Sequence, residues 1–384
     1  MRVLHIGKYF PPYVGGMETY LRDLMTEQSR EGIVSSALVH RSELSLTSRN
    51  ETYVSAGEAL SVTRAAVWAR MLFTPTSPIF PLLMHRMIRR EQPEILHLHM
   101  PNPSVFWALL LPSAKSLPWV VQWHSDVLAS KHSLGLRIFY KLYRPLERAV
   151  LRHSMTIIAS SPPYLKSSEA LAPFEEKCTV IPLGLDTGHL CAGQMKTRSD
   201  TQRLRVLAIG RMTYYKGFEY LIRAAQLTEK VEVRLVGSGE LEESLKRLAK
   251  ELRVQDRVTF LGTASDKQIG QEYANCDCLC LPSIERTEAF GLVLLEAMYF
   301  SKATVVSDVP GSGMGWIVDH GVTGVKVPVS SPEGLADAFR QIQRDRGNLS
   351  RLGRNGRRKF DQMFHISQSA GQISSVYALA LGPR

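Results

Sequence analysis

Short apolar runs alternate with amphipathic stretches along the first half of the chain. The apolar runs are Val3–Ile6, Ser36–His40, Ile95–His99, Val120–Trp123 and Met155–Ala159. Runs this short are typical of strands that are buried on both faces. Between them, apolar residues recur at helical spacing, as in Glu18–Glu31 and Phe139–Arg152. Strands that alternate with helices in this way predict a parallel sheet covered by helices on both faces.

The same rhythm restarts after Asp200. The later apolar runs are Arg205–Ile209, Val231–Val236, Val258–Leu261, Cys278–Pro282 and Thr304–Ser307. The segment Ile181–Thr201 contains one proline, three glycines and little periodicity, as expected of a linker. We therefore predict an α/β protein with two doubly wound parallel-sheet domains, at 1–186 and 202–363, joined by a linker at 187–201. Ligands of such sheets bind at the carboxyl ends of the strands, so the expected site is a cleft between the domains.

The charge distribution favours an anionic partner. The chain of 384 residues has a net charge of +11, and between Arg64 and Lys166 there are 13 Lys and Arg against 4 Asp and Glu. Large apolar residues are interleaved with these charges, as in Arg70–Phe73 and Arg137–Arg144. This pattern fits an element that lies on an anionic membrane surface, and it fits equally an ordinary helix with arginines facing water. A second basic run, Arg344–Lys359, lacks interleaved aromatic residues. It fits a solvated helix face better than a surface that binds nucleic acid.

Several other patterns limit the class of protein. No apolar stretch is long enough to span a membrane, and the N-terminus resembles a first strand rather than a signal peptide. Cys276, Cys278 and Cys280 alternate along one apolar run, which predicts buried thiols rather than disulfides or a zinc site. An Asp-x-Asp pair, which could hold a divalent ion, is absent because no two aspartates stand two residues apart. We therefore expect no metal ion, and we expect no other cofactor. His97 and His99 share one face of a strand, where packing or a place near an acceptor is favoured over metal binding.

Three segments that follow or precede apolar runs are suited to bind phosphates and hydroxyl groups. Gly15 and Gly16 begin a predicted helix, where backbone N–H groups can approach an anion, although a simple tight turn is the alternative. The segment Gly210–Gly217 places Arg211 and Lys216 on a loop after a strand, as suits a pyrophosphate or a solvent-facing turn.

The third segment contains two glutamates, Glu288 and Glu296. Gly291 marks the entry to a predicted helix over Leu292–Tyr299, so Glu296 falls inside an apolar run and needs hydrogen-bond donors. The hydroxyl groups of a ligand would serve, and a buried ion pair is the structural alternative. Glu288 precedes the helix, from where its carboxylate can reach into the cleft.

Together these segments resemble the retaining glycosyltransferases of family 4, which have the GT-B fold with two Rossmann-like domains. The resemblance covers nearly the whole chain. Its most specific part is the pair Glu288 and Glu296, with seven residues between them. Asp319–Gly324 and Ile181–Asp186 also resemble the family's pattern, although Leu183 stands where asparagine is commoner.

The resemblance implies that the N-terminal domain binds the acceptor and the C-terminal domain binds a nucleotide-sugar donor. Arg211 and Lys216 would hold the pyrophosphate, Glu288 a hydroxyl of the sugar and Glu296 the ribose hydroxyls. The implied donor-binding residues are Gly15, Gly16, Gly210, Arg211, Lys216, Gly239, Gly262, Glu288, Phe290, Gly291, Leu292 and Glu296. His124 matches the family histidine near the donor sugar, so the implied catalytic residues are His124, Arg211, Lys216 and Glu288. The segment 364–384 is expected to form a helix that packs back on the N-terminal domain.

The expected function is therefore retaining transfer of a hexose to a lipid-linked saccharide in surface glycan synthesis, with an α-linkage in the product. GDP-mannose is the favoured donor, and UDP-linked glucose or N-acetylglucosamine is an alternative. A sugar-nucleotide epimerase and a non-enzymatic basic protein that binds membrane or nucleic acid also remain open. We expect a cytoplasmic enzyme, peripheral at the inner face of the cytoplasmic membrane, with no nucleic-acid partner.

Overall fold

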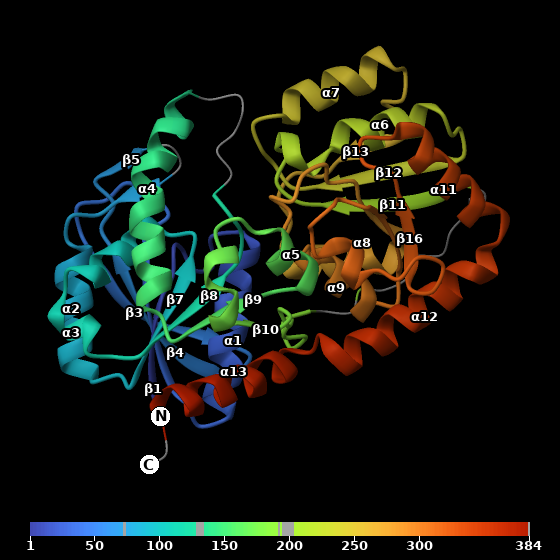
Figure 1. Ribbon diagram of the computed structural model, residues 1–384. Coiled ribbons are helices and arrows are strands. Elements are labelled where there is room, and N and C mark those ends of the chain that lie inside the picture. Colours follow the sequence, from blue (N-terminus) through green and yellow to red (C-terminus); the bar gives the residue numbers. More distant parts are fainter. Residues whose placement is uncertain (72–73, 128–133, 191–192, 194–202, 383–384) are drawn as a thin grey trace. The chain divides into compact units, whose positions relative to one another are not determined.

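The computed structural model describes residues 1–71, 74–127, 134–190, 193 and 203–382. The chain divides into two compact units, each with its own sheet (Figure 1). The first unit comprises Met1–Asp186 together with Ile366–Arg384, and the second comprises Thr187–His365. Most of the expected linker, 187–201, lies outside the described residues.

The first unit contains an eight-stranded sheet in the order β10-β9-β8-β7-β1-β2-β4-β3. The strands are β1 (Arg2–Ile6), β2 (Val34–His40), β3 (Arg49–Ser55), β4 (Glu58–Ala65), β7 (Ile95–Met100), β8 (Trp119–Trp123), β9 (Thr156–Ala159) and β10 (Cys178–Val180). A separate short hairpin joins β5 (Ala69–Met71) and β6 (Thr74–Thr76). The alternation of strands and helices thus produces the predicted sheet, and all its strand pairs but one are parallel.

The exception is the edge strand β3, which runs antiparallel to β4 and which the sequence did not indicate. A two-residue turn at Ala56 and Gly57 joins the strands, with φ of 47° and 87°. Positive φ at both turn residues matches the right-handed twist of a hairpin. Polar residues occupy most of β3, and only Ser55 in it is buried. The strand therefore lacks the apolar run by which other strands were predicted.

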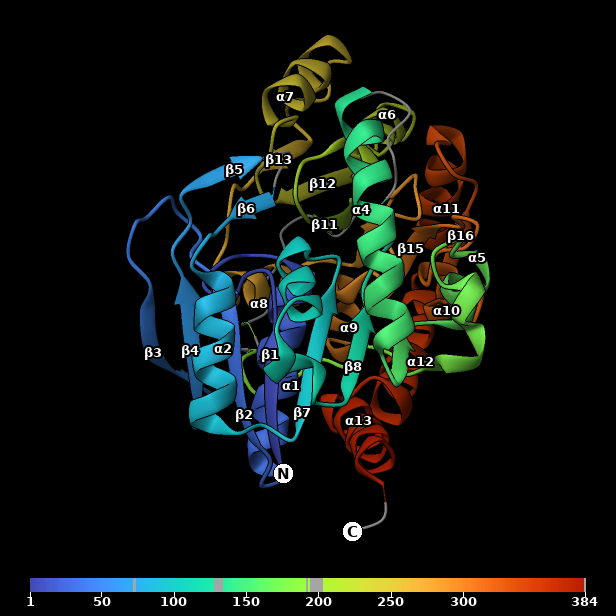
Figure 2. The same ribbon diagram turned by 60° about the vertical axis from the view of Figure 1, so that its left-hand side comes forward.

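Helices cover both faces of this sheet, as Figures 1 and 2 show. They are α1 (Gly16–Arg30), α2 (Phe80–Glu91), α3 (Pro112–Lys115), α4 (Leu134–His153), α5 (Pro162–Ser167), α13 (Ile366–Leu381) and two 3-10 helices at Pro103–Leu109 and Ala172–Lys177. α1 and α13 pack against each other on one face, and α2, α3 and α4 lie with the first 3-10 helix on the other. The Ile366 N–H donates to the Leu185 carbonyl at 3.2 Å, so the chain leaves and re-enters this unit at adjacent points.

The second unit contains a six-stranded, wholly parallel sheet in the order β13-β12-β11-β14-β15-β16. Its strands are β11 (Leu204–Ile209), β12 (Val231–Val236), β13 (Val258–Phe260), β14 (Cys278–Leu281), β15 (Ala303–Ser307) and β16 (Gly324–Val327). Its helices are α6 (Phe218–Gln226), α7 (Glu242–Glu251), α8 (Asp266–Asn275), α9 (Leu292–Tyr299), α10 (Met314–Ile317), α11 (Pro332–Arg344), α12 (Arg346–Met363) and a 3-10 helix at Tyr214–Lys216. α6, α7 and α11 lie on one face of the sheet, and α8, α9 and α12 on the other (Figure 1). This is the doubly wound arrangement that the sequence predicts.

The three alternating cysteines are buried, as predicted. Cys278 and Cys280 lie in β14 and are completely covered, Cys276 precedes the strand, and all three thiols are free. Burial raises the pKa of each thiol, so these side chains behave as small apolar groups.

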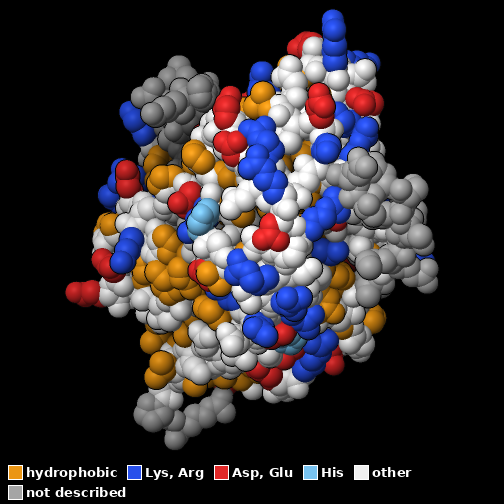
Figure 3. All heavy atoms as spheres, turned by 90° about the vertical axis from the view of Figure 1, so that its right-hand side faces the viewer, with side chains coloured by type: hydrophobic (Ala, Val, Ile, Leu, Met, Phe, Trp, Pro, Cys, Tyr) orange, Lys and Arg blue, Asp and Glu red, His pale blue; other side chains and the backbone are white. Residues whose placement is uncertain are grey.

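The second basic run, Arg344–Lys359, forms the end of α11 and most of α12. Leu352 and Phe360 bury one face of α12, and Arg351 and Arg357 donate to the carbonyls of Gly321 and Tyr299. Figure 3 shows the side of the molecule on which α11 and α12 lie, with Lys and Arg side chains gathered among acidic ones. These contacts fit the solvated helix face that the sequence favours. Within the described residues, no helix is long and apolar enough to cross a membrane.

Candidate active site

The strand order of the second unit defines where a ligand binds. Numbered from β11, the order is 3-2-1-4-5-6, and it reverses direction between β11 and β14. Parallel sheets of this kind bind ligands at this switch point, outside the carboxyl ends of the strands. Two of the three predicted segments follow β11 and β14 directly, at Gly210–Gly217 and Pro282–Gly291. The topology therefore brings together the two segments that carry Lys216 and Glu288.

Glycines shape the loop after β11. Gly217 has φ of 65°, ends the 3-10 helix Tyr214–Lys216 and begins α6, a turn that favours a residue without a side chain. At Gly210, a Cβ atom would lie 3.0 Å from Cε and 3.1 Å from Nζ of Lys216. The glycine thus leaves the space through which the lysine side chain crosses the end of β11.

Lys216 and Glu288 form an ion pair at the switch point. Lys216 Nζ lies 2.5 Å from Glu288 Oε2, and the two side chains are only 10% and 12% exposed. Burial lowers the pKa of Lys216, but the adjacent Glu288 carboxylate and Tyr215 more than offset this, so the net shift is upward. The ammonium is therefore charged at neutral pH. A buried, charged lysine at this position suits an anionic ligand.

Further hydrogen bonds hold Glu288 and its loop. The Ser283 hydroxyl lies 3.4 Å from Glu288 Oε2, and the Ser312 hydroxyl donates to the Glu288 carbonyl at 2.5 Å. The loop after β11 is tied to the same region, because Tyr214 donates to Glu285 at 2.8 Å. Three loops from the carboxyl edge of the sheet thus fix the glutamate.

The start of α9 offers backbone donors beside Glu288. Gly291, with φ of 86°, precedes the first helical residue, Leu292. Within the described parts of the chain, no residue accepts a hydrogen bond from the N–H of Phe290, Gly291 or Leu292. Unpaired N–H groups at a helix start are suited to bind phosphate or hydroxyl oxygens. These are the three N–H groups that the sequence comparison with family 4 implies as donor-binding.

Glu296 is partly exposed rather than enclosed in the apolar run, which corrects the expectation from the sequence. It lies one turn into α9 and accepts a hydrogen bond from the Tyr273 hydroxyl at 3.0 Å. Burial and the Glu296 carboxylate both raise the pKa of Tyr273, so the hydroxyl remains a donor. One face of the carboxylate is held by the protein, and its partial exposure leaves access for ligand hydroxyls.

The remaining predicted residues of this unit line the same edge of the sheet. Arg211 follows β11, has an exposed side chain and lies close enough to Lys216 to lower its pKa slightly. Gly239 follows β12, where a Cβ atom would meet the Met212 backbone at 2.5 Å. Gly262 follows β13, and its carbonyl accepts from the Gly237 N–H at 2.8 Å. All the predicted donor-binding residues from 210 to 296 therefore belong to one unit and one edge.

The predicted glycines Gly15 and Gly16 lie in the first unit, at the start of α1. Gly15 has extended backbone torsions, with φ of 177°, so its conformation needs no glycine. Its lack of a side chain leaves room for the Glu18 carboxylate, which a Cβ atom would contact. Gly16 is exposed and begins the helix. The first turn of α1 thus already holds one carboxylate near its N–H groups.

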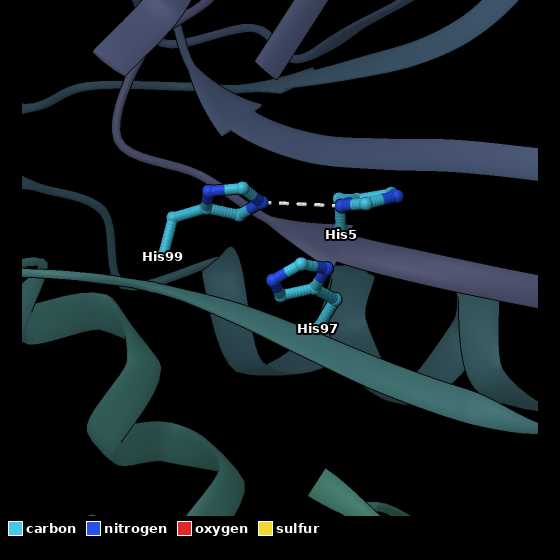
Figure 4. Close-up of side chains that lie close together, drawn as sticks. All are labelled: His5, His97 and His99. Atoms are coloured by element: carbon cyan, nitrogen blue, oxygen red, sulfur yellow. Dashed lines mark hydrogen bonds between the residues drawn. The ribbon is translucent and has the colours of Figure 1, made fainter. Parts of the chain in front are cut away.

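His124 follows β8 and is the outer member of a row of buried histidines. Its Nε2 lies 3.1 Å from His99 Nδ1, and His99 Nε2 lies 3.1 Å from His5 Nδ1. The nitrogens of His5, His97 and His99 lie within 4.8 Å of one another, as a metal site would require (Figure 4). The sequence pointed to His97 and His99 on one face of β7, but it did not show that His5 of β1 joins them.

Sequence reasoning missed several residues that hold the site. Ser312 and Tyr273 fix Glu288 and Glu296 from other loops and helices, and no pattern in the sequence connects them. Ser283 stands beside Pro282 in the glutamate motif, and only the structure shows its contact with Glu288.

Comparisons with known proteins agree with this architecture. The family described as "Glycosyl transferases group 1" matches residues 194–359, and "Glycosyl transferase 4-like domain" matches residues 15–184. O-antigen chain mannosyltransferase C of Escherichia coli is 29% identical over 99% of each chain. D-rhamnosyltransferase WbpZ of Pseudomonas aeruginosa is 30% identical over 95% of this chain and 92% of its own. Sucrose-phosphate synthase from Thermosynechococcus elongatus superimposes with a TM-score of 0.80 at 21% identity, covering 98% of each chain.

The fold and these relatives define a hexosyltransferase with two Rossmann-like domains of the GT-B type. The chain belongs to the group 1 glycosyltransferases, of the family 4 type.

Proposed function

We propose that the protein transfers mannose from GDP-mannose to a lipid-linked saccharide, with retention of configuration and an α-linkage in the product. The observation that carries this proposal is the arrangement at the switch point of the second unit. There a buried ammonium, a carboxylate and three unpaired N–H groups lie at one edge of the sheet. Such a set binds a diphosphate together with the hydroxyls of the attached sugar.

Each residue has a role that follows from its chemistry. Lys216 and Arg211 stabilise the negative charge that develops on the nucleoside diphosphate as it leaves. Glu288 accepts a hydrogen bond from a sugar hydroxyl, while the N–H groups of Phe290, Gly291 and Leu292 bind oxygens beside it. Glu296, which is partly exposed and accepts a hydrogen bond from Tyr273, also accepts hydrogen bonds from ribose hydroxyls. His124 contributes a hydrogen bond to the donor sugar. The departing phosphate assists deprotonation of the acceptor hydroxyl on the same face, which retains the configuration.

The names of the relatives support mannose as the transferred sugar. One full-length relative is a mannosyltransferase of an O-antigen chain, and another is a D-rhamnosyltransferase. D-rhamnose is 6-deoxy-D-mannose, so both names specify sugars of one configuration. The O-antigen function of the first relative also supports a saccharide acceptor in surface glycan synthesis.

The surface of the first unit supports a lipid-linked acceptor at an anionic membrane. On α4, Leu142 and Leu146 are 72% and 45% exposed, and they lie among exposed Lys141, Arg144 and Arg148. Exposed leucines among basic residues on one helix are suited to the boundary between lipid headgroups and acyl chains.

The first test is a thermal-shift titration of the full chain with GDP, GDP-mannose, UDP, UDP-glucose and UDP-N-acetylglucosamine. A ligand present at 100 times its Kd stabilises the folded state by about 2.7 kcal/mol, which such a scan detects. We expect stabilisation by GDP and GDP-mannose, and we expect Glu296→Ala to weaken it. Stabilisation by the uridine compounds alone would replace the donor in the proposal, and stabilisation by none would contradict it.

A further inference from the structure

A continuous row of hydrogen bonds runs through the core of the first unit and ends at His124. Gln28 Oε1 lies 2.9 Å from His5 Nε2, and two histidine-to-histidine contacts of 3.1 Å lead on through His99 to His124. Figure 4 shows the contact between His5 and His99 in the middle of this row. Gln28, His5 and His99 are at most 1% exposed, and His124 keeps 6% exposure beyond the end of β8. The row thus connects a buried amide on α1 with the outermost histidine.

The row has a direction, because a neutral imidazole has one N–H donor and one acceptor nitrogen. Gln28 Oε1 can only accept, so His5 carries its proton on Nε2 and offers Nδ1 as an acceptor. His99 must then donate from Nε2, and His124 must donate from Nε2 to His99 Nδ1. The last member, His124, is left with an unprotonated Nδ1.

The Gln28 amide makes two further contacts, both with hydroxyl groups. Its NH2 group donates to the Tyr377 hydroxyl at 3.1 Å, and its Oε1 also accepts from the Ser35 hydroxyl at 2.5 Å. The Tyr377 hydroxyl also lies 2.5 Å from His97 Nδ1. Tyr377 belongs to α13, so the returning C-terminal helix contacts the amide at which the row begins.

We propose that Gln28 is a positioning residue that sets the tautomer of His124 through His5 and His99, so that His124 presents Nδ1 as a hydrogen-bond acceptor to a donor-sugar hydroxyl. The inference rests on the proposed function for the sugar contact. The tautomer itself is a property of the unliganded protein. If His124 Nδ1 were protonated, it would donate to this sugar hydroxyl instead of accepting from it. The hydrogen of the hydroxyl would then have to point away from His124.

The buried histidines and the two tyrosines that contact them, Tyr20 and Tyr377, are neutral at neutral pH. Burial lowers the pKa of His5 to about 4 and that of His124 to about 3, and it lowers those of His97 and His99 as well. Burial also raises the pKa of Tyr20 on α1 and of Tyr377 on α13. The nearby Asp23 also contributes to the raised pKa of Tyr20. Burial raises the pKa of Asp23 itself to about 7. The row is therefore expected to keep one direction between pH 6 and pH 8.

Hydrogen bonds within the protein, those of the row and one between His97 and Tyr377, fit the three central histidines better than a metal ion does. The group that could coordinate an ion consists of His5, His97 and His99, all buried, with no carboxylate among the described residues that join it. A divalent cation there would carry its charge into the core without compensation. It would also break the bond between His5 and His99.

The direct test is to record histidine ¹⁵N spectra of the full chain without ligand, assigned with single histidine variants. We expect His5, His99 and His124 to be neutral Nε2–H tautomers from pH 6 to pH 8. An Nδ1–H tautomer at His99 or His124, or one equivalent of zinc in the purified protein, would overturn the proposal. This measurement is independent of any nucleotide sugar, so it separates failure of the row from failure of the proposed function.

The functional test compares two substitutions of Gln28. Gln28→Met removes the acceptor at nearly constant volume, so both tautomers become accessible to His124. We expect its affinity for GDP-mannose to fall on the order of fivefold to tenfold, with its affinity for GDP unchanged because GDP lacks the mannose that His124 would contact. Equal losses for both ligands would indicate a purely structural role, and no loss for either would contradict the proposal.

Gln28→Glu makes the direction of the row depend on pH. At high pH the introduced carboxylate accepts from His5 as the amide does. When the carboxylate and His5 together take up one proton, either His5 gains a proton on Nδ1 or the carboxylic acid donates to Nε2. Both outcomes reverse the row and place a proton on His124 Nδ1.

We therefore expect Gln28→Glu to lose activity below the pKa of this pair and to recover it above, whereas the wild type stays level. The matched control is Ser104→Ala, which removes a 2.9 Å partner from another buried histidine, His40. It should give the wild-type pH profile. A flat profile in Gln28→Glu, with the variant folded, would overturn the proposal even if Gln28→Met failed to fold.

Discussion

Lys216 and Glu288 are 72 residues apart in the sequence, and their side chains meet at 2.5 Å where β11 lies beside β14. Neither residue is held by its own segment alone. The lysine crosses the space left by Gly210, and the glutamate is fixed by hydroxyl groups from Ser283 and Ser312. The strand order thus creates the pair, and the loops orient it for a ligand that carries both a diphosphate and hydroxyl groups.

Removing one partner of this pair should affect activity and stability together. Lys216→Met leaves the Glu288 carboxylate buried without its cation, and we expect the free energy of unfolding to fall by about 3 kcal/mol. The double variant Lys216→Met/Glu288→Leu should regain most of that stability, because neither charge remains. Denaturant unfolding of the three proteins measures this difference.

The same variants separate stability from catalysis. We expect the rate of sugar transfer to fall at least 100-fold in Lys216→Met and in the double variant. Removing a group that stabilises charge in the transition state typically lowers the rate by such a factor. A stable double variant that kept substantial activity would show that the pair is only structural. Glu288→Gln serves as a further control, because it keeps the size of the side chain and one hydrogen-bond acceptor.

Tyr273→Phe should weaken donor binding without removing any atom that touches the donor. The hydroxyl of Tyr273 holds one oxygen of Glu296 at 3.0 Å, so its loss removes one of the contacts that orient the carboxylate. We expect the Kd for the nucleotide to rise about fivefold, a smaller effect than that of Glu296→Ala. Calorimetric titration of both variants provides the comparison, and an equal or larger loss in Tyr273→Phe would contradict this account.

The sequence predicted the second unit better than the first for a physical reason. Parallel strands that are buried throughout, such as β14 and β15, are short and mostly apolar runs, and the residues after them stand at the ligand edge by topology alone. The edge strand β3 has few apolar residues and is specified by a two-residue turn instead. Its pairing could be seen only once the sheet was known.

The supporting contacts of the site were beyond the sequence for a similar reason. A motif shows that Glu288 and Glu296 share a loop and a helix, but Ser312 and Tyr273 contact them from a neighbouring loop and a neighbouring helix that are distant from both glutamates or unrelated to the motif in the sequence. The row from Gln28 to His124 joins three strands and a helix, and each histidine alone looks like an ordinary core residue. Long-range hydrogen bonds carry no periodicity for a sequence to reveal.

Glu147 should make the protein less stable as the pH rises from acid to neutral. It is buried on α4 with Oε1 unpartnered, and its burial and the nearby Asp126 raise its pKa from 4.5 to about 7. The folded state therefore binds a proton more tightly than the unfolded state, and stability is lost between about pH 4.5 and pH 7. Glu147→Gln should be about 2–3 kcal/mol more stable than the wild type at pH 8, and it should lose this advantage at pH 4. Thermal unfolding at both pH values measures the difference, and an advantage independent of pH would refute the titration of this group.

The exposed face of α4 gives the sharpest test of membrane association. Arg144→Gln/Arg148→Gln removes two positive charges next to Leu142 and Leu146, and each charge near an anionic surface is worth about 1 kcal/mol. We expect binding to vesicles rich in phosphatidylglycerol to weaken at least tenfold at low salt. The matched control is Arg354→Gln/Arg358→Gln, which makes the same charge change on exposed positions of α12 in the other unit. If both double variants lost equal affinity, only the net charge of the protein would matter. If neither lost any, α4 would have no part in membrane binding.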